Sequence, residues 1–375
     1  MIDKISFENF KSFSKGEIEL KPITILLGAN NVGKSSIIQL ILMIVQTANI
    51  NKRYNSALRL NGEYVKLGEA ENIFKDMKVN KILNVDLIFD AEDYLSITKS
   101  LSGMVHDIFI ERYSLLNRIR HILQQTEILE NWQTISKRLK DRANPDEIIT
   151  ILSNAKEIQR IIKAHIKVDS QKTIEIEKYI LKTTGEKLNL KDIINYNFNE
   201  AILTIQFLIN LESMLDKNLE ISFDIKHSPS DDRLEVASLK ISSNKKVILQ
   251  SSHNNKFHFY TDFLNVKSIE KYRVGIGKVL VFDSIFQLKD MHNIDEVGYY
   301  PRRFLLSNSK SIFVEVIYYL TQFALANLRE CVGSEFINYV NPLRAFPKRY
   351  YFLDKANLSH SLNTIDGDNL TEVLK

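Results

Sequence analysis

The sequence predicts an α/β fold in which an antiparallel β meander carries an inserted helical bundle and a glycine-rich loop. Three observations lead to this prediction. Apolar and polar residues alternate with the period of a strand at 83–89 and again from residue 219 onward, whereas the residues between follow a helical period. A short apolar run at 22–27 leads into the glycine-rich loop, and an amphipathic helix follows that loop.

The composition is that of an ordinary globular chain. The 375 residues are 44% hydrophobic and 26% charged, which favours a sizeable core over disorder. A formal net charge of +4 neither requires nor excludes a nucleic-acid partner. Cys331 is the single cysteine, which excludes an internal disulfide framework and argues against a zinc site built on thiolates. A chain with one cysteine suits a reducing, cytoplasmic compartment.

The start of the chain and its two most apolar stretches predict no membrane contact. Met1–Lys4 leads into alternating polar and apolar residues, so we expect no export segment. The stretch 37–45 is short, and 312–328 is interrupted by Glu315 and Gln322, whereas a spanning helix needs about 20 mostly apolar residues. Both stretches are expected to form buried helices.

The first hundred residues predict strands on both sides of a helix. Ile5 and Phe7 alternate with polar neighbours in a first strand, and 22–27 is expected to form a further, apolar strand. The helix after the loop presents apolar residues at 37, 38, 40, 41 and 44. A later strand places four apolar side chains on one face: Leu83, Val85, Leu87 and Phe89.

The period becomes helical between about 105 and 218. Asn144 or Asp146, on either side of Pro145, could cap a helix there. The heptad pattern is too short for an extended coiled coil, so a compact bundle is expected, either as an assembly stalk or as a lid that docks a partner. Apolar residues recur at spacings of three and four: Leu115, Ile119, Ile122, Leu123, Ile128, Trp132, Ile135, Leu139, Ile148, Ile151, Leu152, Ala155, Ile158 and Ile162.

Strict alternation returns at 219–226, and further short strands follow at 234–241, 247–249 and 257–259. This succession predicts a meander, then the buried helix at 312–328, then a turn-rich end. We therefore divide the chain into an N-terminal lobe at 1–104, a helical insertion at 105–218, and a continuation of the first lobe at 219–375.

The residues from Gly28 to Ser35 fit the P-loop pattern of a glycine, four residues and Gly-Lys-Ser, between an apolar strand and a helix. The glycines let backbone N–H groups converge on phosphate oxygens, and the helix start adds further N–H groups. Lys34 is expected to reach the β- and γ-phosphates, and the Ser35 hydroxyl to be a ligand of Mg²⁺. A chance glycine loop is the alternative, which the matching flanks disfavour. The expected loop contacts are Gly28, Asn30, Asn31, Gly33, Lys34, Ser35 and Ser36.

Two segments resemble the opening of the SMC/RecF-like, ABC-type ATPases: Ile5–Phe13, which ends in Asn-Phe-Lys-Ser-Phe, and Ile23–Ser36. The resemblance implies a P-loop NTPase fold of the ABC-type ATPase head, with Asn9, Lys11 and Ser12 as further nucleotide contacts. Shorter matches resemble a bacterial branch, the stand-alone AAA ATPases found beside nucleases in phage-defence operons: Gly62–Gly68, Asn341–Arg344, Pro347 and Arg349–Tyr351. The helical insertion is not covered.

In the family that these segments resemble, ATP and Mg²⁺ are held between two heads, so that binding drives dimerisation and hydrolysis releases it. The resemblance thus implies a homo-oligomer, either a head-to-head dimer or a larger assembly. It also implies an effector partner such as a nuclease, a role in phage defence or DNA repair, and the option of direct DNA contact.

The motifs that would complete hydrolysis are not found. Val279–Asp283 has the apolar run and the aspartate of a Walker B strand, but Ser284 stands where the family has glutamate, and no signature-like Ser-Gly segment precedes it. Asp283 is therefore either a metal-associated acid or an ordinary residue at the end of a strand, and the catalytic residues stay unassigned. We expect the motifs to lie beyond residue 375 in a longer protein. A degenerate head that binds nucleotide without hydrolysing it is the alternative.

Three functions remain open on these grounds. The leading one is an ATP-binding SMC/RecF-like head that acts as a nucleotide-controlled sensor or scaffold. The second is an overcoming-lysogenization-defect-type ATPase-nuclease, whose Toprim domain would follow residue 375. The third is a non-hydrolysing interaction module.

Two other groups of polar residues are candidates for sites. The eight histidines are scattered and are read as surface residues, since no spacing suggests a closed metal site. A basic stretch could contact DNA phosphates or a partner's acidic surface, although a solvated helix end explains it as well: Lys137, Arg138, Lys140 and Arg142.

Overall fold

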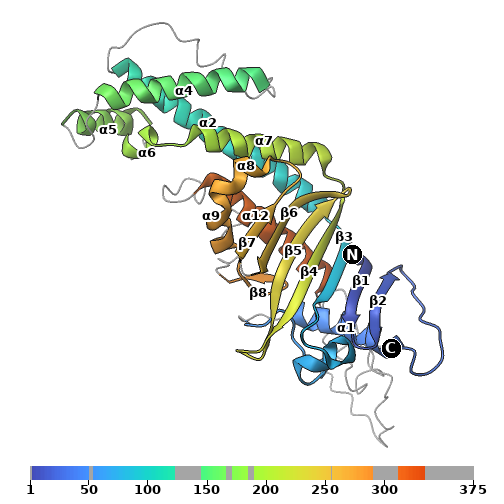
Figure 1. Ribbon diagram of the computed structural model, residues 1–375. Coiled ribbons are helices and arrows are strands. Elements are labelled where there is room, and N and C mark those ends of the chain that lie inside the picture. The colour runs from blue at the N-terminus through green and yellow to red at the C-terminus, as the bar shows by residue number, and fades with distance from the viewer. Residues whose placement is uncertain are drawn as a thin grey trace, which may run out of the picture. The chain divides into compact units, whose positions relative to one another are not determined.

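The computed structural model describes residues 2–49, 54–122, 145–165, 171–184, 190–254, 256–289 and 311–333 (Figure 1). These residues fall into two compact units. The first contains the described residues of Met1–Tyr94, Leu215–Met291 and Leu320–Lys375, and the second contains those of Leu95–Met214 and His292–Tyr319.

A seven-stranded sheet, in which every pairing is antiparallel, is the frame of the first unit. The strands follow the order β2-β1-β3-β4-β5-β6-β7 across it (Figure 1). Their bounds are β1 (Ile2–Phe10), β2 (Phe13–Glu19), β3 (Leu83–Asp90), β4 (Asn218–Ser228), β5 (Arg233–Ser243), β6 (Lys246–Asn254) and β7 (Lys256–Tyr260).

One face of this sheet forms the core, as the alternating pattern predicts. Val85 on β3 and its register partner Phe223 on β4 are both fully buried, and every second residue on these strands is buried with them. Side chains of successive strand residues point to opposite faces, so the polar residues between them lie on the other face. The expected α/β class with an antiparallel meander is confirmed.

The chain leaves the sheet after β3 and returns at β4, the strand next to it. The backbone N–H of Ala91 donates a hydrogen bond of 2.7 Å to the carbonyl of Lys217, which holds the exit and the return together. Among the described residues, the helices between these points are α2 (Glu92–Ile122), α4 (Pro145–His165), α5 (Gln171–Thr184), α6 (Leu190–Ile194) and α7 (Phe198–Met214). The first of them begins at Glu92, before residue 105, and the last ends at Met214, before residue 218, the bounds predicted for the insertion.

Aromatic contacts and one buried carboxylate organise the second unit. Phe109 meets Phe198 edge to face at 5.6 Å between ring centroids, and Phe207 meets Phe313 in the same way at 5.7 Å. Glu200 on α7 is buried and accepts hydrogen bonds from the Ser311 hydroxyl and, at 3.1 Å, from the backbone N–H of Phe313. It thereby supplies a partner to the first turn of α12 (Ile312–Val332).

The first unit also contains α1 (Lys34–Ala48), which lies at the β1–β2 end of the sheet, and α9 (Arg273–Val279), which lies beside β7 (Figure 1). The two stretches expected to be buried helices are confirmed as α1 and α12. The smaller elements are η1 (Ala70–Ile73), η2 (Lys75–Met77), α8 (Val266–Ile269), η3 (Glu270–Tyr272), β8 (Phe282–Ser284) and β9 (Gln287–Leu288).

The strand predicted at 22–27 is not formed. Ile23, Ile25 and Leu27 are 81%, 72% and 87% exposed, and no described strand pairs with this segment. The cause is physical: a strand needs a hydrogen-bonding neighbour, and alternating apolar residues need a surface to cover. Among the described residues, neither is present beside 22–27.

Several sequence predictions fall on residues that the structure does not describe. The helical repeats at 123–139, the basic stretch at 137–142 and the segment at 341–351 lie outside the described residues. In the part of the chain that is described, no helix is long and apolar enough to cross a membrane.

Candidate nucleotide-binding site

The predicted P-loop connects the exposed segment at 22–27 to α1, and its backbone turns through left-handed conformations. Gly28, Asn31 and Gly33 have φ angles of 152°, 69° and 98°. Glycine adopts such angles without steric cost, and asparagine tolerates them better than most residues. Left-handed residues set among right-handed ones are the backbone pattern from which anion-binding loops are built.

The N-terminus of α1 has no cap of its own. Gly33 precedes Lys34, the first residue of the helix, no side chain caps the helix, and its first turn contains no acidic residue. The first N–H groups of a helix have no partner within the helix and carry the positive end of its dipole. Ser35 and Ser36 place two hydroxyls at this end, and Ser35 is exposed. The helix end is therefore suited to an anion rather than to a side chain of this chain.

Lys34 closes over the loop. Its ammonium nitrogen donates hydrogen bonds to the carbonyl oxygens of Gly28 and Ala29, at 2.7 Å and 2.6 Å. These are bonds to neutral acceptors, and an ammonium group bonds more strongly to an anionic oxygen. Lys34 thus lies at the mouth of the loop, in contact with the loop itself, where it can transfer to a phosphate.

An aromatic ring from the first hairpin supports the end of the loop. A Cβ atom added to Gly33 would lie 2.4 Å from the Phe13 ring, so the ring packs directly on the glycine backbone. Phe13 in turn meets Phe7 edge to face, at 5.5 Å between ring centroids. The strands β1 and β2 therefore fix the place at which the loop becomes a helix.

Among the further contacts implied by the family resemblance, Asn9 lies near the end of β1, and Lys11 and Ser12 lie in the turn between β1 and β2. Asn9 donates to the carbonyl of Ile82 at 2.9 Å, and the Lys11 ammonium donates to the side chain of Gln39 on α1 at 2.5 Å. Burial lowers the pKa of Lys11, which makes its charge easier to lose than that of an exposed lysine. Ser12 is exposed. Contact of the three with a nucleotide stays a prediction.

Sequence reasoning missed the residue that fixes the loop 59–68 to α1. The amide of Gln46 is buried, donates to the carbonyl of Arg59 at 2.6 Å and accepts from the N–H of Val65 at 3.1 Å. The Thr47 hydroxyl accepts from the N–H of Arg59 at 2.9 Å. The signal was a Gln-Thr pair within an otherwise apolar helix, because buried polar groups need partners.

Asp283 does not join the P-loop. It is buried on the short strand β8, which pairs only with β9 among the described strands. It lines a cavity of about 200 Å³ together with Arg233 and His253, and no residue of 28–36 contributes to that wall. Across the described ranges, no group of three or more His, Cys, Asp or Glu side chains is arranged to hold a metal ion.

A model of the AAA ATPase domain matches residues 1–274, which include the P-loop, the inserted helices and the whole antiparallel sheet. The chain belongs to the AAA ATPase domain family. This assignment agrees with the loop geometry and the uncapped helix, and it makes this AAA ATPase domain a member of a nucleotide-binding family. A comparison with curated proteins finds no match.

Proposed function

We propose that this AAA ATPase domain binds ATP with Mg²⁺ at residues 28–36 and acts as an SMC/RecF-like head, a nucleotide-controlled sensor or scaffold. The observation that carries the proposal is the combination at one point of a left-handed glycine turn, an uncapped helix N-terminus and the Lys34 ammonium. Each of these features favours a polyphosphate, and together they leave a cradle of donors with no acidic residue in the first turn.

Each loop residue has a specific role in this proposal. Lys34 exchanges its two carbonyl partners for β- and γ-phosphate oxygens. Gly28 and Gly33 let the backbone approach the phosphates, and Asn30, Asn31 and Ser36 add further polar contacts. Ser35 offers the hydroxyl oxygen that would hold Mg²⁺, a hard ion that prefers oxygen ligands, and the ion would neutralise phosphate charge there.

We also propose that the head works as a homo-oligomer. Large apolar side chains lie exposed just before the loop, at Ile23, Ile25 and Leu27, and within it, at Val32. Adjacent exposed apolar residues of this size mark interaction surfaces more often than free surface. A second copy facing the loop would cover them and would join nucleotide binding to assembly. The effector, with a nuclease as the leading candidate, and the setting in phage defence or DNA repair rest on the family resemblance.

A non-hydrolysing module is the second candidate. It is supported by Asp283, which lines a cavity to which no residue of 28–36 contributes. The two candidates share the nucleotide site and differ in phosphate release. Direct contact with DNA is not required by either.

The decisive experiment compares Lys34→Ala with the parent by isothermal titration calorimetry with ATP and Mg²⁺. Loss of one ammonium that bonds to phosphate is expected to weaken binding by at least about tenfold, since charge-assisted hydrogen bonds contribute about 1.5–3 kcal/mol. Lys278→Ala, at an exposed position on α9, is the matched control and should bind like the parent. Equal affinity for Lys34→Ala and the parent would remove the assignment. Phosphate release measured on the parent separates the hydrolysing head from the non-hydrolysing module.

A further inference from the structure

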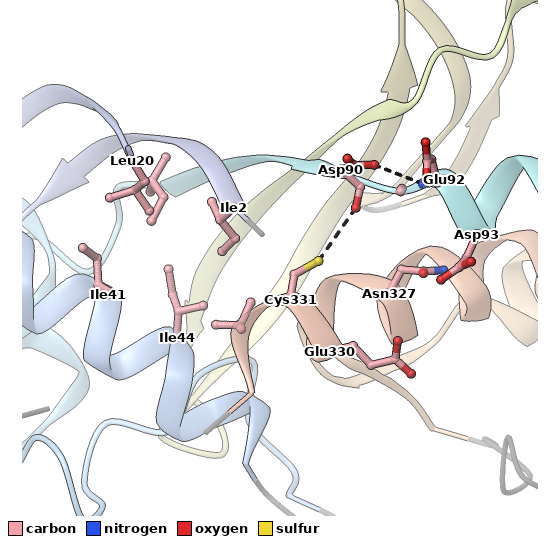
Figure 2. A pocket seen from close by; sticks show the side chains of 13 residues that line it. Ile2, Leu20, Ile41, Ile44, Asp90, Glu92, Asp93, Asn327, Glu330 and Cys331 are labelled. Atoms are coloured by element: carbon pink, nitrogen blue, oxygen red, sulfur yellow. Dashed lines mark hydrogen bonds between the residues drawn. The ribbon is translucent and has the colours of Figure 1, made fainter. Parts of the chain in front are cut away.

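A second cavity lies on the first unit, against the C-terminal half of α1 and away from the P-loop residues. It has a volume of about 620 Å³, within the usual range for binding pockets. Its apolar wall comes from Ile2 and Ile5 of β1, Ile41 and Ile44 of α1, Val332 at the end of α12, and Leu20, which follows β2. We call this cavity the α1 groove. Figure 2 shows Ile2, Leu20, Ile41 and Ile44 gathered on one side of it.

Carboxylates occupy the opposite side of the groove. Asp90, Glu92, Asp93 and Glu330 all line it, and the lining contains no lysine or arginine (Figure 2). Glu92 and Asp93 belong to the first turn of α2, whose dipole favours their ionised form. The α12 helix ends at Val332, so its C-terminal carbonyl groups add negative potential to the same wall.

An apolar floor next to an acidic rim selects its ligand by charge as well as by shape. An acidic peptide or a nucleic acid would meet like charge at the rim, and a purely apolar segment would bury the carboxylates without a partner. Apolar side chains that alternate with lysine or arginine satisfy both walls, because their cationic ends reach the rim while their stems cover the floor.

We propose that the α1 groove is a docking site for a basic, amphipathic segment of a partner protein. The segment places its apolar residues against Leu20, Ile41 and Ile44, and its cations against Glu92, Asp93 and Glu330. It would contact the same helix whose N-terminus forms the P-loop. The proposal stands on the groove alone and does not depend on the proposed function.

Modification of the single cysteine of the chain measures directly whether the α1 groove is occupied. Cys331 lines the groove, where its thiol lies 3.8 Å from the carbonyl oxygen of Asp90 (Figure 2). The experiment measures the rate at which N-ethylmaleimide modifies Cys331 in the full chain, followed by mass spectrometry. It is run at alkaline pH, because burial raises the pKa of this thiol and the thiolate is the reactive form.

Three synthetic peptides of equal length serve as probes: one alternates leucine and lysine, one alternates leucine and glutamate, and one alternates serine and lysine. The Leu-Lys peptide is expected to slow modification by at least about tenfold at saturation, and its protection should weaken as salt rises. The other two peptides should protect weakly or not at all, because each satisfies only one wall of the groove.

Variants test the rim. The triple variant Glu92→Gln, Asp93→Asn, Glu330→Gln should bind the Leu-Lys peptide about tenfold more weakly, on the basis of roughly 0.2–1 kcal/mol for each exposed pair. A control triple at exposed positions elsewhere in the first unit, Glu63→Gln, Glu69→Gln, Glu71→Gln, has the same change in net charge and should retain parental affinity. Far-ultraviolet circular dichroism confirms that both triples are folded.

Several results would overturn the proposal. Equal protection by the Leu-Glu peptide would show that charge does not select the ligand. Protection that rises with protein concentration in the absence of peptide would assign the groove to a second copy of the chain. Resistance to N-ethylmaleimide at every dilution without peptide would show that the chain itself covers the groove. The absence of protection by the Leu-Lys peptide would remove the docking site altogether.

Discussion

Phe13 packs its ring directly on the backbone of Gly33, so closely that a single added carbon on the glycine would lie 2.4 Å from the ring. Gly33 also has a φ angle of 98°, which side-chain-bearing residues rarely adopt. The junction between the P-loop and α1 is thus constrained twice, once by backbone conformation and once by the first hairpin. The Asn-Phe-Lys-Ser-Phe motif and the P-loop are parts of one packed structure.

The first prediction concerns this contact. Gly33→Ala should lower stability by at least about 1–3 kcal/mol, from backbone strain and a clash with Phe13, and should abolish ATP binding by shifting the loop. Urea unfolding and calorimetry measure the two effects. In the double variant Gly33→Ala, Phe13→Ala, the clash is removed while the φ angle stays unfavourable, so the loss of stability should be smaller than the sum of the losses in the two single variants. Full stability in Gly33→Ala alone would contradict the contact.

The second prediction concerns Ser35, which is exposed at the start of α1. Ser35→Ala removes the hydroxyl assigned to Mg²⁺ but leaves the backbone N–H groups and Lys34 in place. Nucleotide affinity measured without Mg²⁺ should therefore stay near that of the parent, while the gain in affinity on adding Mg²⁺ should be reduced. Titrations at several Mg²⁺ concentrations show this difference. An unchanged dependence on Mg²⁺ would mean that another residue holds the ion.

The third prediction concerns Gln46, whose buried amide bonds to Arg59 and Val65. Gln46→Leu leaves the Arg59 carbonyl and the Val65 N–H without their partner, at about 1–3 kcal/mol for each buried group that stays unpaired. The midpoint of urea denaturation should fall accordingly. Gln39→Leu, at a half-buried position on the same helix, is the comparison, because its amide contacts only the Lys11 side chain in the described structure. It should cost less than Gln46→Leu.

The fourth prediction concerns pH and Asp86, on the polar face of β3. Burial raises the pKa of this carboxyl above its ordinary value of 3.8, and the nearby carboxylates of Glu220 and Asp224 act in the same direction. The native state therefore binds the proton more tightly than the unfolded state does. The contribution of Asp86 to stability is fully present below the unfolded pKa and is lost as pH rises through the folded pKa.

Asp86→Asn removes the loss of stability that accompanies ionisation of the Asp86 carboxyl. The variant should be more stable than the parent near neutral pH, and the difference should shrink as pH falls toward about 4. Denaturation curves at a series of pH values measure the difference, with Glu63→Gln on an exposed loop as the control. A difference that grows toward acid pH would reverse the sign and refute the prediction.

Local patterns were enough to predict most of the fold. The strict alternation on β3 and β4 reflects one-sided burial, and the apolar stretches of α1 and α12 reflect burial on most of their faces; the structure confirms both. The segment at 22–27 has an equally strong pattern and is not a strand. Apolar residues in a strand pattern favour burial, but a strand forms only where a neighbouring strand is available for hydrogen bonding. No described strand pairs with Ile23 or Ile25, and both are exposed.

The candidate site, too, could be predicted from the sequence only in part. The P-loop could be predicted because its chemistry is local: backbone angles at Gly28 and Gly33 and one ammonium five residues from its carbonyl partner at Ala29. The support of Gly33 by Phe13 and the acidic rim of the α1 groove could not, because they join residues distant in sequence. Contacts of that kind depend on the register of the sheet and on where helices end, which a single sequence leaves open.

The hydrogen bond between Ala91 and Lys217 has a consequence for how such a chain can change. The points at which the polypeptide departs from the sheet and rejoins it are adjacent, so the register of β3 against β4 is set without reference to the length of what intervenes. Whole modules could be gained, lost or exchanged at this junction while the strands around it keep their pairing. The same sheet can thus carry different inserted domains between β3 and β4.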